Sequence, residues 1–218
     1  MIKGIIFDFD GTLFDSMSIW DTVGDDYLRS MGRVPEEDLK EKLKPLSLLQ
    51  VAEYLKGRYS IELSVREIMD GIDRMVEDFY FHVAAPREGI IPLLEELVRR
   101  NIRMCIATAT DRYLVEGALK RFGMERFFSD IFTCTEVGKG KDSPEIFRIA
   151  MARLETDRET TAVFEDAYHA VRTAREDGFK VVVIRDAHET RQEELSRLAD
   201  VYLEDYSELD RLKKLASV

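Results

Sequence analysis

Short apolar segments rich in β-branched residues alternate along the chain with segments in which apolar residues recur every three or four positions. The first pattern is typical of buried strands, and the second of helices that cover a sheet. Because the two alternate, the sequence predicts an α/β fold with a doubly wound, Rossmann-like parallel sheet. Gly123 and Gly178 stand where two of the helices should end in a left-handed turn. The predicted strands are residues 3–8, 103–108, 131–135, 162–165 and 180–184, with a weaker one at 201–203, and the predicted helices between them are 113–122, 144–154 and 168–176.

The region from residue 16 to residue 83 breaks this alternation. It shows no strand pattern, only amphipathic helical stretches such as 46–59 and 65–81. Parallel strands are normally joined by a single helix, so a long helical segment between the first and second strands predicts an inserted domain. A helix within 86–97 then restarts the core. The predicted organisation is a core of residues 1–15 and 84–218 with a helical insert of residues 16–83.

Composition narrows the class of partner. The 218 residues include 32 basic and 43 acidic ones, and the net charge of −11 argues against nucleic acid or an anionic membrane as the main partner. No apolar run approaches the roughly 20 residues of a membrane span, and no targeting segment is visible. Cys105 and Cys134 both lie in strand-like stretches and indicate no disulfide framework. We therefore expect a cytoplasmic protein whose oligomeric state the sequence leaves open, with a monomer favoured.

The stretch IIFDFDGT raises a chemical question. Asp8 and Asp10 lie one residue apart at the end of the first predicted strand, on the same side of an extended chain. Two neighbouring carboxylates repel, and each raises the pKa of the other unless a cation lies between them. Asp10 and Gly11 form an ordinary turn dipeptide, but a turn does not explain why an aspartate stands at position 8.

Ligands of a doubly wound sheet bind at the carboxyl ends of its strands. Acidic oxygen donors without histidine favour a hard cation such as Mg²⁺, which is usually shared with a substrate phosphate. A lysine and a threonine could hold the other oxygens of that phosphate, and an aspartate can attack phosphorus. The polar residues at the predicted strand ends fit this composition: Asp8, Asp10, Thr108, Glu165 and Asp166, with Lys139 and Lys141 between the third strand and its helix.

The motifs Asp8-Phe9-Asp10-Gly11-Thr12, Thr108, Lys141 and Glu165-Asp166 resemble, in order and spacing, the four motifs of the haloacid dehalogenase-like hydrolases. The insert after the first motif resembles the helical cap of the branch that contains β-phosphoglucomutase and many small-molecule phosphatases. The resemblance covers essentially the whole chain. It implies a catalytic core with a cap domain, and a Mg²⁺-dependent phosphatase that hydrolyses a small phosphorylated metabolite through an aspartyl-phosphate.

The resemblance also implies a role for each matching residue. Asp8 would be the nucleophile, and Asp10 would protonate the leaving alcohol and then activate water. Thr108, the backbone of Ala109 and Lys141 would hold the phosphoryl group. The metal ligands implied are Asp8, the carbonyl of Asp10 and Asp166, with Glu165 in or just behind the ligand shell.

The lysine motif departs from the usual pattern. Asp142 follows Lys141 where proline is common, so Lys139 stays a rival for the phosphate site. The stretch 143–147, which reads SPEIF, continues the family pattern from Lys141 and favours that residue.

The insert should choose the substrate, and its candidate contacts are Ser16 and Trp20. Ser16 is equally well interpreted as a helix N-cap. Trp20 and Leu48 occupy the positions at which the mutase pattern has a histidine and an arginine, so the resemblance favours hydrolysis, although Lys44 could partly replace the arginine. Arg112 is interpreted as a solvated residue at the start of a helix, and a contact with the phosphate is the less favoured interpretation.

Other functions stay open at this stage. A phosphosugar mutase of the β-phosphoglucomutase type is the alternative enzyme. A dehalogenase is disfavoured by Asp10, because the dehalogenases of the family lack an acid there. A signalling receiver domain is disfavoured by the insert and by the early position of Asp8. A non-catalytic phosphate- or metal-binding regulatory protein is the alternative from a different class, although no catalytic position is missing. The sequence does not identify the substrate.

Overall fold

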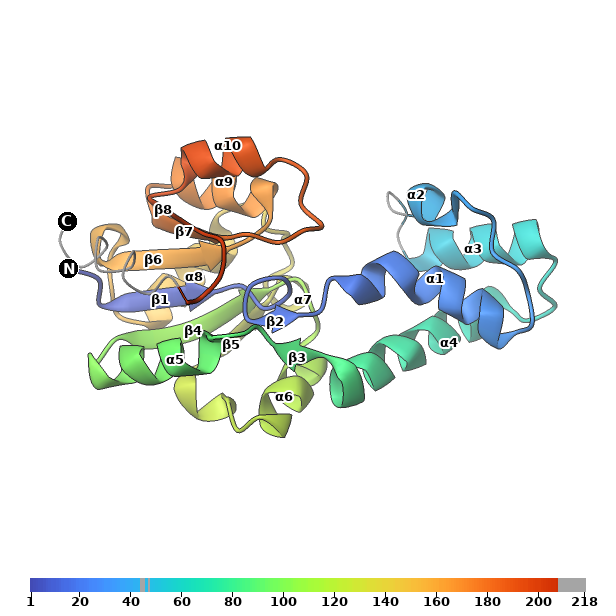
Figure 1. Cartoon of the computed structure of the whole chain (residues 1–218), viewed down its shortest axis with the longest axis horizontal. Helices are drawn as coiled ribbons and strands as arrows, with labels where there is room; N and C mark the ends of the chain where they lie inside the picture. The colour runs from blue at the N-terminus through green and yellow to red at the C-terminus, as the bar shows by residue number, and fades with distance from the viewer. Residues whose placement is uncertain (44–45, 47, 208–218) are drawn as a thin grey trace. The chain divides into compact units, whose positions relative to one another are not determined.

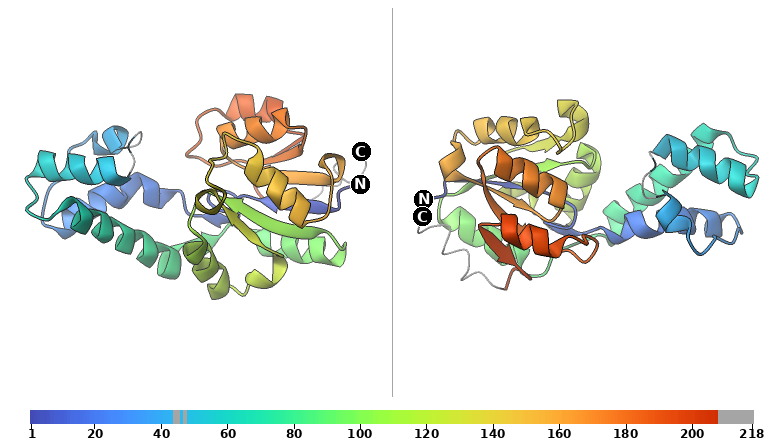
Figure 2. Two further views of the ribbon diagram at one scale, coloured as in Figure 1. Left: turned by 180° about the vertical axis from the view of Figure 1, so that it is seen from behind. Right: turned by 90° about the horizontal axis from the view of Figure 1, so that it is seen from above.

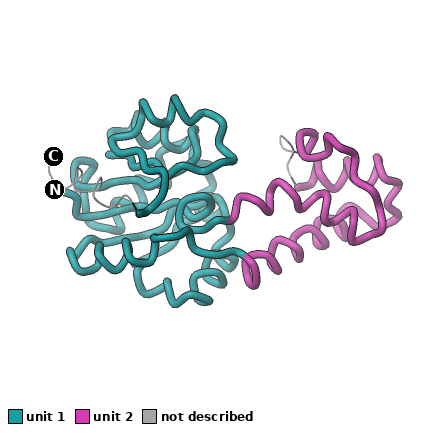
Figure 3. The backbone as a smooth tube through the Cα atoms, in the orientation of Figure 1, with its two compact units in different colours: residues 1–15, 84–218 teal, residues 16–83 magenta. Residues whose placement is uncertain are grey.

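The chain forms two compact units in the computed structural model, which describes residues 1–43, 46 and 48–207. Unit 1 consists of Met1–Asp15 and Ala84–Val218, and unit 2 consists of Ser16–Val83 (Figure 3). Among the described residues, none of the helices combines the length and the apolar composition that a bilayer crossing requires.

A six-stranded parallel sheet lies at the centre of unit 1 (Figure 1). Its strand order is β5-β4-β1-β6-β7-β8, so the chain winds outward from β1 in one direction and then from β6 in the other. The crevice beside β1 and β6 is therefore the point at which such a sheet binds ligands. The strands are β1 (Gly4–Phe7), β4 (Arg103–Thr108), β5 (Ile131–Thr133), β6 (Thr161–Glu165), β7 (Lys180–Ile184) and β8 (Val201–Leu203).

Helices cover both faces of this sheet. Figures 1 and 2 show α5 and α8 on opposite faces. On one face, buried strand residues such as Ile6 and Val163 pack against Phe147 of α8 and Val171 of α9. Burial from both sides explains why the strands read as near-continuous apolar runs. The helices of unit 1 are α5 (Ile90–Arg99), α6 (Arg112–Arg121), α7 (Cys134–Val137), α8 (Glu145–Arg153), α9 (Tyr168–Glu176) and α10 (Gln192–Leu198), with short 3₁₀ turns η2 (Glu125–Phe127) and η3 (Arg158–Thr160).

A two-stranded antiparallel ribbon marks the two places where the chain passes between the units. Its strands are β2 (Phe14–Asp15) and β3 (Ala85–Pro86). Directly after β3, the N–H of Arg87 donates to the carbonyl of Leu13 at 2.9 Å. Strands of two residues have no measurable period, so the sequence pattern does not predict this ribbon.

Among its described residues, unit 2 consists of helices joined by turns and irregular segments, such as 31–38 and 60–64, and contains no strand. Helix α4 begins with a capping box, in which Ser64 accepts from the N–H of Glu67 and the Glu67 carboxylate accepts from the N–H of Ser64. Gly71 of α4 leaves room for Tyr27, because a Cβ at this position would lie 2.5 Å from the Tyr27 ring. The helices are α1 (Ser18–Ser30), α2 (Leu39–Leu43), α3 (Leu48–Tyr59), α4 (Val65–Asp78) and the π-helical turn η1 (Phe79–Val83).

The structure confirms the parallel sheet and all six predicted strands, whose boundaries agree within one residue except at the end of β5. The predicted strand 131–135 ends at Thr133, and Cys134 begins α7. The reason is a capping box, since the Thr133 hydroxyl accepts from the N–H of Glu136 at 3.1 Å and favours a helix start. Gly123 and Gly178 follow their helices with φ of +61° and +90°, as predicted. The predicted helix 65–81 ends as an α-helix at Asp78 and continues as η1.

Candidate active site

Three buried carboxylates meet at the carboxyl ends of β1 and β6. Asp8 follows β1, Glu165 ends β6 and Asp166 follows it. The N–H of Asp8 donates to the carbonyl of Phe164 at 2.9 Å, which fixes the two strand ends side by side. One carboxylate oxygen of each residue lies within 4.8 Å of the others, and the three residues are only 8%, 0% and 4% exposed.

Burial of three acids together is electrostatically costly. Burial, followed by the charge of Glu165, raises the pKa of Asp8 to about 8. The same two causes raise the pKa of Asp166 well above its ordinary value. Carboxylates in this arrangement stay ionised only when cations lie close to them. The cluster therefore favours the binding of positive charge.

Lys141 supplies one such charge. Its ammonium group contacts Oδ1 of Asp8 and lies 2.6 Å from Oε1 of Glu165. Burial alone would lower the pKa of Lys141, but the charges of Asp8 and Glu165 outweigh that effect and raise it. Lys139 bonds instead to Glu145 at 3.0 Å, with its side chain 54% exposed. The structure thus brings Lys141, and not Lys139, to Asp8.

Glu165 uses both of its oxygens within the protein. Oε1 accepts from Lys141, while Oε2 accepts from the N–H groups of Asp166 at 2.9 Å and Ala167 at 3.0 Å. This carboxylate therefore orients the lysine and the turn that carries Asp166.

The turn after Asp10 packs directly against Asp166. The Thr12 hydroxyl donates to Oδ1 of Asp166 at 3.0 Å. Gly11 has φ of +73°, and a Cβ at this position would lie 2.4 Å from Oδ2 of Asp166. Only glycine fits both the left-handed conformation and this close approach.

Asp10 has a partner that the sequence analysis missed. The Thr110 hydroxyl donates to Oδ2 of Asp10 at 2.5 Å, and the Thr110 N–H donates to the Thr108 hydroxyl at 3.0 Å. Thr108 is fully buried at the end of β4, and Ala109 between the two threonines is exposed. Residues 109–110 form a bend after β4, so this contact depends on the path of the loop and leaves no periodic signal in the sequence.

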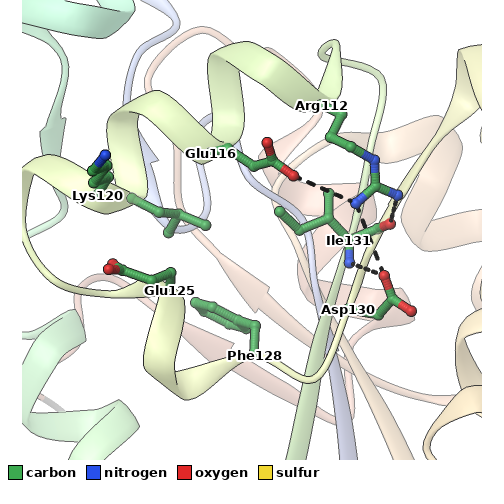
Figure 4. Close-up of a pocket in the computed structure, with 8 residues that line it drawn as sticks. Arg112, Glu116, Lys120, Glu125, Phe128, Asp130 and Ile131 are labelled. Atoms are coloured by element: carbon green, nitrogen blue, oxygen red, sulfur yellow. Dashed lines mark hydrogen bonds and ion pairs between the residues drawn. The ribbon is translucent and has the colours of Figure 1, made fainter.

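Arg112 contributes to a different part of unit 1. Its guanidinium bonds to Glu136 at 2.6 Å and to the carbonyl of Ile131 at 2.5 Å. It lines a pocket of about 370 Å³ together with apolar residues such as Phe128 and Ile131 (Figure 4). The residues that line this pocket do not include Asp8, Asp10, Thr108, Lys141, Glu165 or Asp166. Arg112 is thus neither a simple solvated helix start nor a member of the Asp8 cluster.

Residues 5–184 match the family described as haloacid dehalogenase-like hydrolases. The chain belongs to this family. Its relatives include a phosphorylated carbohydrates phosphatase of Thermotoga maritima, which is 24% identical and aligns over 82% of this chain and 83% of that protein. The protein CbbY of Cereibacter sphaeroides is 28% identical over 99% of this chain and 97% of that protein. A crystal structure of CbbY from Rhodobacter sphaeroides in complex with phosphate has a TM-score of 0.78 and 26% identity, covering 99% of this chain and 100% of that chain.

The residues predicted to contact the substrate from the insert of this haloacid dehalogenase-like hydrolase, Ser16 and Trp20, lie in unit 2. Trp20 lies on α1 with 49% of its surface exposed. Ser16 is fully buried, and the N-cap position of α1 falls on Met17, so the N-cap interpretation of Ser16 is wrong. Here the backbone carbonyl of Ser16, which accepts from the N–H of Ile19 at 3.3 Å, takes part in the first turn. Leu48 is the first residue of α3, and Lys44 lies outside the described residues.

Proposed function

We propose that this protein is a Mg²⁺-dependent phosphatase that hydrolyses a small phosphomonoester through an aspartyl-phosphate on Asp8. The observation that carries the proposal is the position of the Asp8 carboxylate, buried between the ammonium group of Lys141 and the carboxylates of Glu165 and Asp166. Relatives that are named as phosphatases support the same class of reaction.

The donor set fits a small hard cation. Three carboxylates lie close together with only one lysine to offset their charge, and all the atoms that could coordinate a metal are oxygens. The excess negative charge favours binding of a divalent cation. Asp8, Asp166 and the carbonyl of Asp10 are the proposed ligands, and Glu165 lies behind them because Lys141 and two N–H groups occupy its oxygens. When bound, Mg²⁺ would offset the charge of the phosphoryl oxygens and of the carboxylates.

The proposed chemistry uses two carboxylates in turn. An oxygen of Asp8 attacks phosphorus, the bond from phosphorus to the ester oxygen breaks, and Asp10 gives its proton to the leaving alcohol. Asp10 then takes a proton from water as the water oxygen attacks phosphorus, which releases inorganic phosphate and restores Asp8. Thr110 holds Asp10 for both transfers through its hydrogen bond to Oδ2. Thr108 and Lys141 hold the phosphoryl oxygens.

Unit 1 is the proposed catalytic core, and unit 2, Ser16–Val83, is the proposed cap. All of the residues given a chemical role belong to unit 1. The cap would supply contacts that select the substrate, and Ser16 and Trp20 are its candidates.

The test is phosphate release over a panel of sugar, nucleotide and short-acid phosphates, with Mg²⁺ and with excess EDTA. We expect turnover of at least one ester, complete loss with EDTA, and complete loss in Asp8→Asn, since an amide cannot form the acyl phosphate. Asp142→Asn is the matched control, because Asp142 is an exposed neighbour of Lys141. Failure to release phosphate from any ester, or equal rates in the wild type and Asp8→Asn, would contradict the proposal.

A further inference from the structure

Two successive carbonyls in the loop of residues 8–12, here called the Asp8 loop, are held by side chains from distant parts of unit 1. Nη1 of Arg87 donates to the carbonyl of Gly11 at 2.7 Å. The hydroxyl of Tyr206 donates to the carbonyl of Thr12 at 3.0 Å. Neither Arg87 nor Tyr206 takes part in the proposed chemistry, so these contacts need another explanation.

Arg87 is itself fixed from several sides. Its Nη1 lies 3.0 Å from Oδ2 of Asp186, and its Nη2 donates to the carbonyl of Arg185 at 2.8 Å. The other oxygen of Asp186 accepts from the N–H of His188 at 2.8 Å. The side chains of Arg87 and Asp186 are only 17% and 4% exposed, so this ion pair is shielded from solvent more than a surface pair is. The planar guanidinium bonds a carboxylate and two carbonyls at once, which an ammonium group cannot reproduce.

Tyr206 is a second anchor of the same loop. Its side chain is 1% exposed and lies against the start of α5. Gly89, the N-cap residue of α5, has φ of +81°, and a Cβ there would lie 3.0 Å from Cβ of Tyr206. This close approach places the backbone and Cβ of Tyr206 beside α5, and the buried side chain carries its hydroxyl to the carbonyl of Thr12.

The Asp8 loop passes these restraints on to Asp166. Gly11 lies against Oδ2 of Asp166, and Thr12 donates to Oδ1. The Gly11 carbonyl belongs to the Gly11–Thr12 peptide, so a shift of this carbonyl would move both contacts with Asp166 and would alter the preceding Asp10–Gly11 peptide, which carries the Asp10 carbonyl. Arg87 directly follows β3, so its hydrogen bond to Gly11 also ties the ribbon of β2 and β3 to the Asp8 loop.

We propose that Arg87, held by Asp186, is a positioning residue for the metal end of the active site. By fixing the Gly11 carbonyl it sets the orientation of the Asp10 carbonyl and of the Asp166 carboxylate, two of the three proposed Mg²⁺ ligands. This inference rests on the proposed function, because it takes these groups as the metal site.

The test measures Mg²⁺ affinity directly, by calorimetric titration of the metal-free protein, together with kcat and KM for the best substrate of the panel. Loss of such an outer partner typically costs about 10–100-fold in metal affinity or activity. We expect Arg87→Met to raise the Kd for Mg²⁺ within that range and to lower kcat with little change in KM. Arg87→Lys should recover only part of the loss. Arg158→Met is the matched control, since Arg158 also bonds a carbonyl and a carboxylate, both of Asp177, and should leave the Kd unchanged.

An unchanged Kd in folded Arg87→Met, or an equal rise in Arg158→Met, would overturn the inference. Should Arg87→Met fail to fold, Arg87→Gln carries the same test, because its polar side chain suits the partly exposed site but cannot bond the carboxylate and the two carbonyls together. A raised Kd in that variant supports the inference, and an unchanged one overturns it. The titration needs no turnover. A protein that binds Mg²⁺ through this arrangement but hydrolyses no ester would therefore contradict the proposed function and leave the role of Arg87 supported.

Discussion

Nζ of Lys141 lies 2.6 Å from Oε1 of Glu165 and also contacts Asp8, so a single ammonium group bridges the ends of β1 and β6. Lys139, two residues earlier, has an exposed side chain and bonds to Glu145. We therefore expect Lys141→Ala to lower kcat by about 10²-fold or more, the usual cost of removing a group that stabilises charge in the transition state. Lys139→Ala should stay close to wild type in the same phosphate-release assay. Equal small losses in the two variants would place the phosphate-site lysine elsewhere.

Thr110 should matter because it holds Asp10. Thr110→Val keeps the shape but removes the donor to Oδ2, and we expect kcat to fall about 10-fold, while Thr110→Ser restores it. Asp10→Asn should cost more, about 10²–10⁴-fold, because the proposed acid–base group itself is lost. The three variants are compared by kcat at saturating substrate and Mg²⁺. A Thr110→Val enzyme with wild-type kcat would show that Asp10 does not depend on this hydrogen bond.

Gly11→Ala separates backbone strain from damage to the site. Gly11 and Gly32 share a left-handed φ, +73° and +68°, but only at Gly11 would a Cβ meet another group, Oδ2 of Asp166 at 2.4 Å. Gly32→Ala should lose about 1–2 kcal/mol of stability, measured by urea unfolding, since a non-glycine residue is strained at that φ. Gly11→Ala should lose at least as much, because its Cβ would also meet Asp166. Only Gly11→Ala should lose phosphatase activity and Mg²⁺ binding. Activity lost equally in Gly32→Ala would mean that general destabilisation is the cause.

The ends of parallel strands explain why the acidic cluster was predictable. Asp8 and Asp166 are far apart in the sequence, but each directly follows a run of strand type, and parallel strands bring their carboxyl ends to one edge. The fold was predictable for the same reason, because runs of β-branched residues report buried strands whatever the detail of the loops. Prediction of the acidic cluster therefore required only the order of strands and helices along the chain.

The supporting residues were not predictable in this way. Thr110, Arg87 and Tyr206 reach the Asp8 loop by particular side-chain rotamers and loop paths, which leave no periodic signal in the sequence. The ribbon of β2 and β3 is too short to produce a pattern. The end of β5 was misjudged because the apolar run continues through Cys134, while a local capping box at Thr133 decides where the helix begins.

Glu36 in unit 2 gives a prediction about pH. Its carboxylate accepts from the Tyr54 hydroxyl at 2.6 Å and pairs with Arg58 and Lys42, and these contacts lower its pKa to about 2. The folded state therefore binds this proton less readily than the unfolded state does, so the contribution to stability is present above pH about 4.5 and is lost as the pH falls toward about 2.

The test compares urea unfolding of the wild type with that of Glu36→Gln across this range. The wild type should be the more stable at neutral pH, and its advantage should shrink steadily as the pH falls below about 4.5. Glu37→Gln, a change at an exposed neighbour, should follow the wild type. An advantage that does not change with pH would show that Glu36 acts only through packing.

Finally, we expect the enzyme to hydrolyse its ester and not to isomerise a sugar phosphate. In the β-phosphoglucomutase pattern, a cap histidine couples proton transfer to the correct sugar and a cap arginine holds the second phosphate. Counted from the Asp8–Asp10 motif, Trp20 and Leu48 fall at these positions. The indole of Trp20 can donate a hydrogen bond but cannot accept one, and the side chain of Leu48 has no charge. Neither residue can relay a proton or bind a second dianion.

The measurement is incubation with β-glucose 1-phosphate, Mg²⁺ and a catalytic amount of glucose 1,6-bisphosphate, following glucose 6-phosphate against free phosphate. Phosphate release should exceed isomerisation, because neither Trp20 nor Leu48 can hold the second phosphate of a bisphosphate while it turns around. Trp20→His combined with Leu48→Arg tests the cause, since restoring both side chains should raise the ratio of isomerisation to hydrolysis above that of the wild type. Isomerisation that outpaces phosphate release in the wild type would assign the protein to the mutases, with some other group of the cap in the place of the arginine.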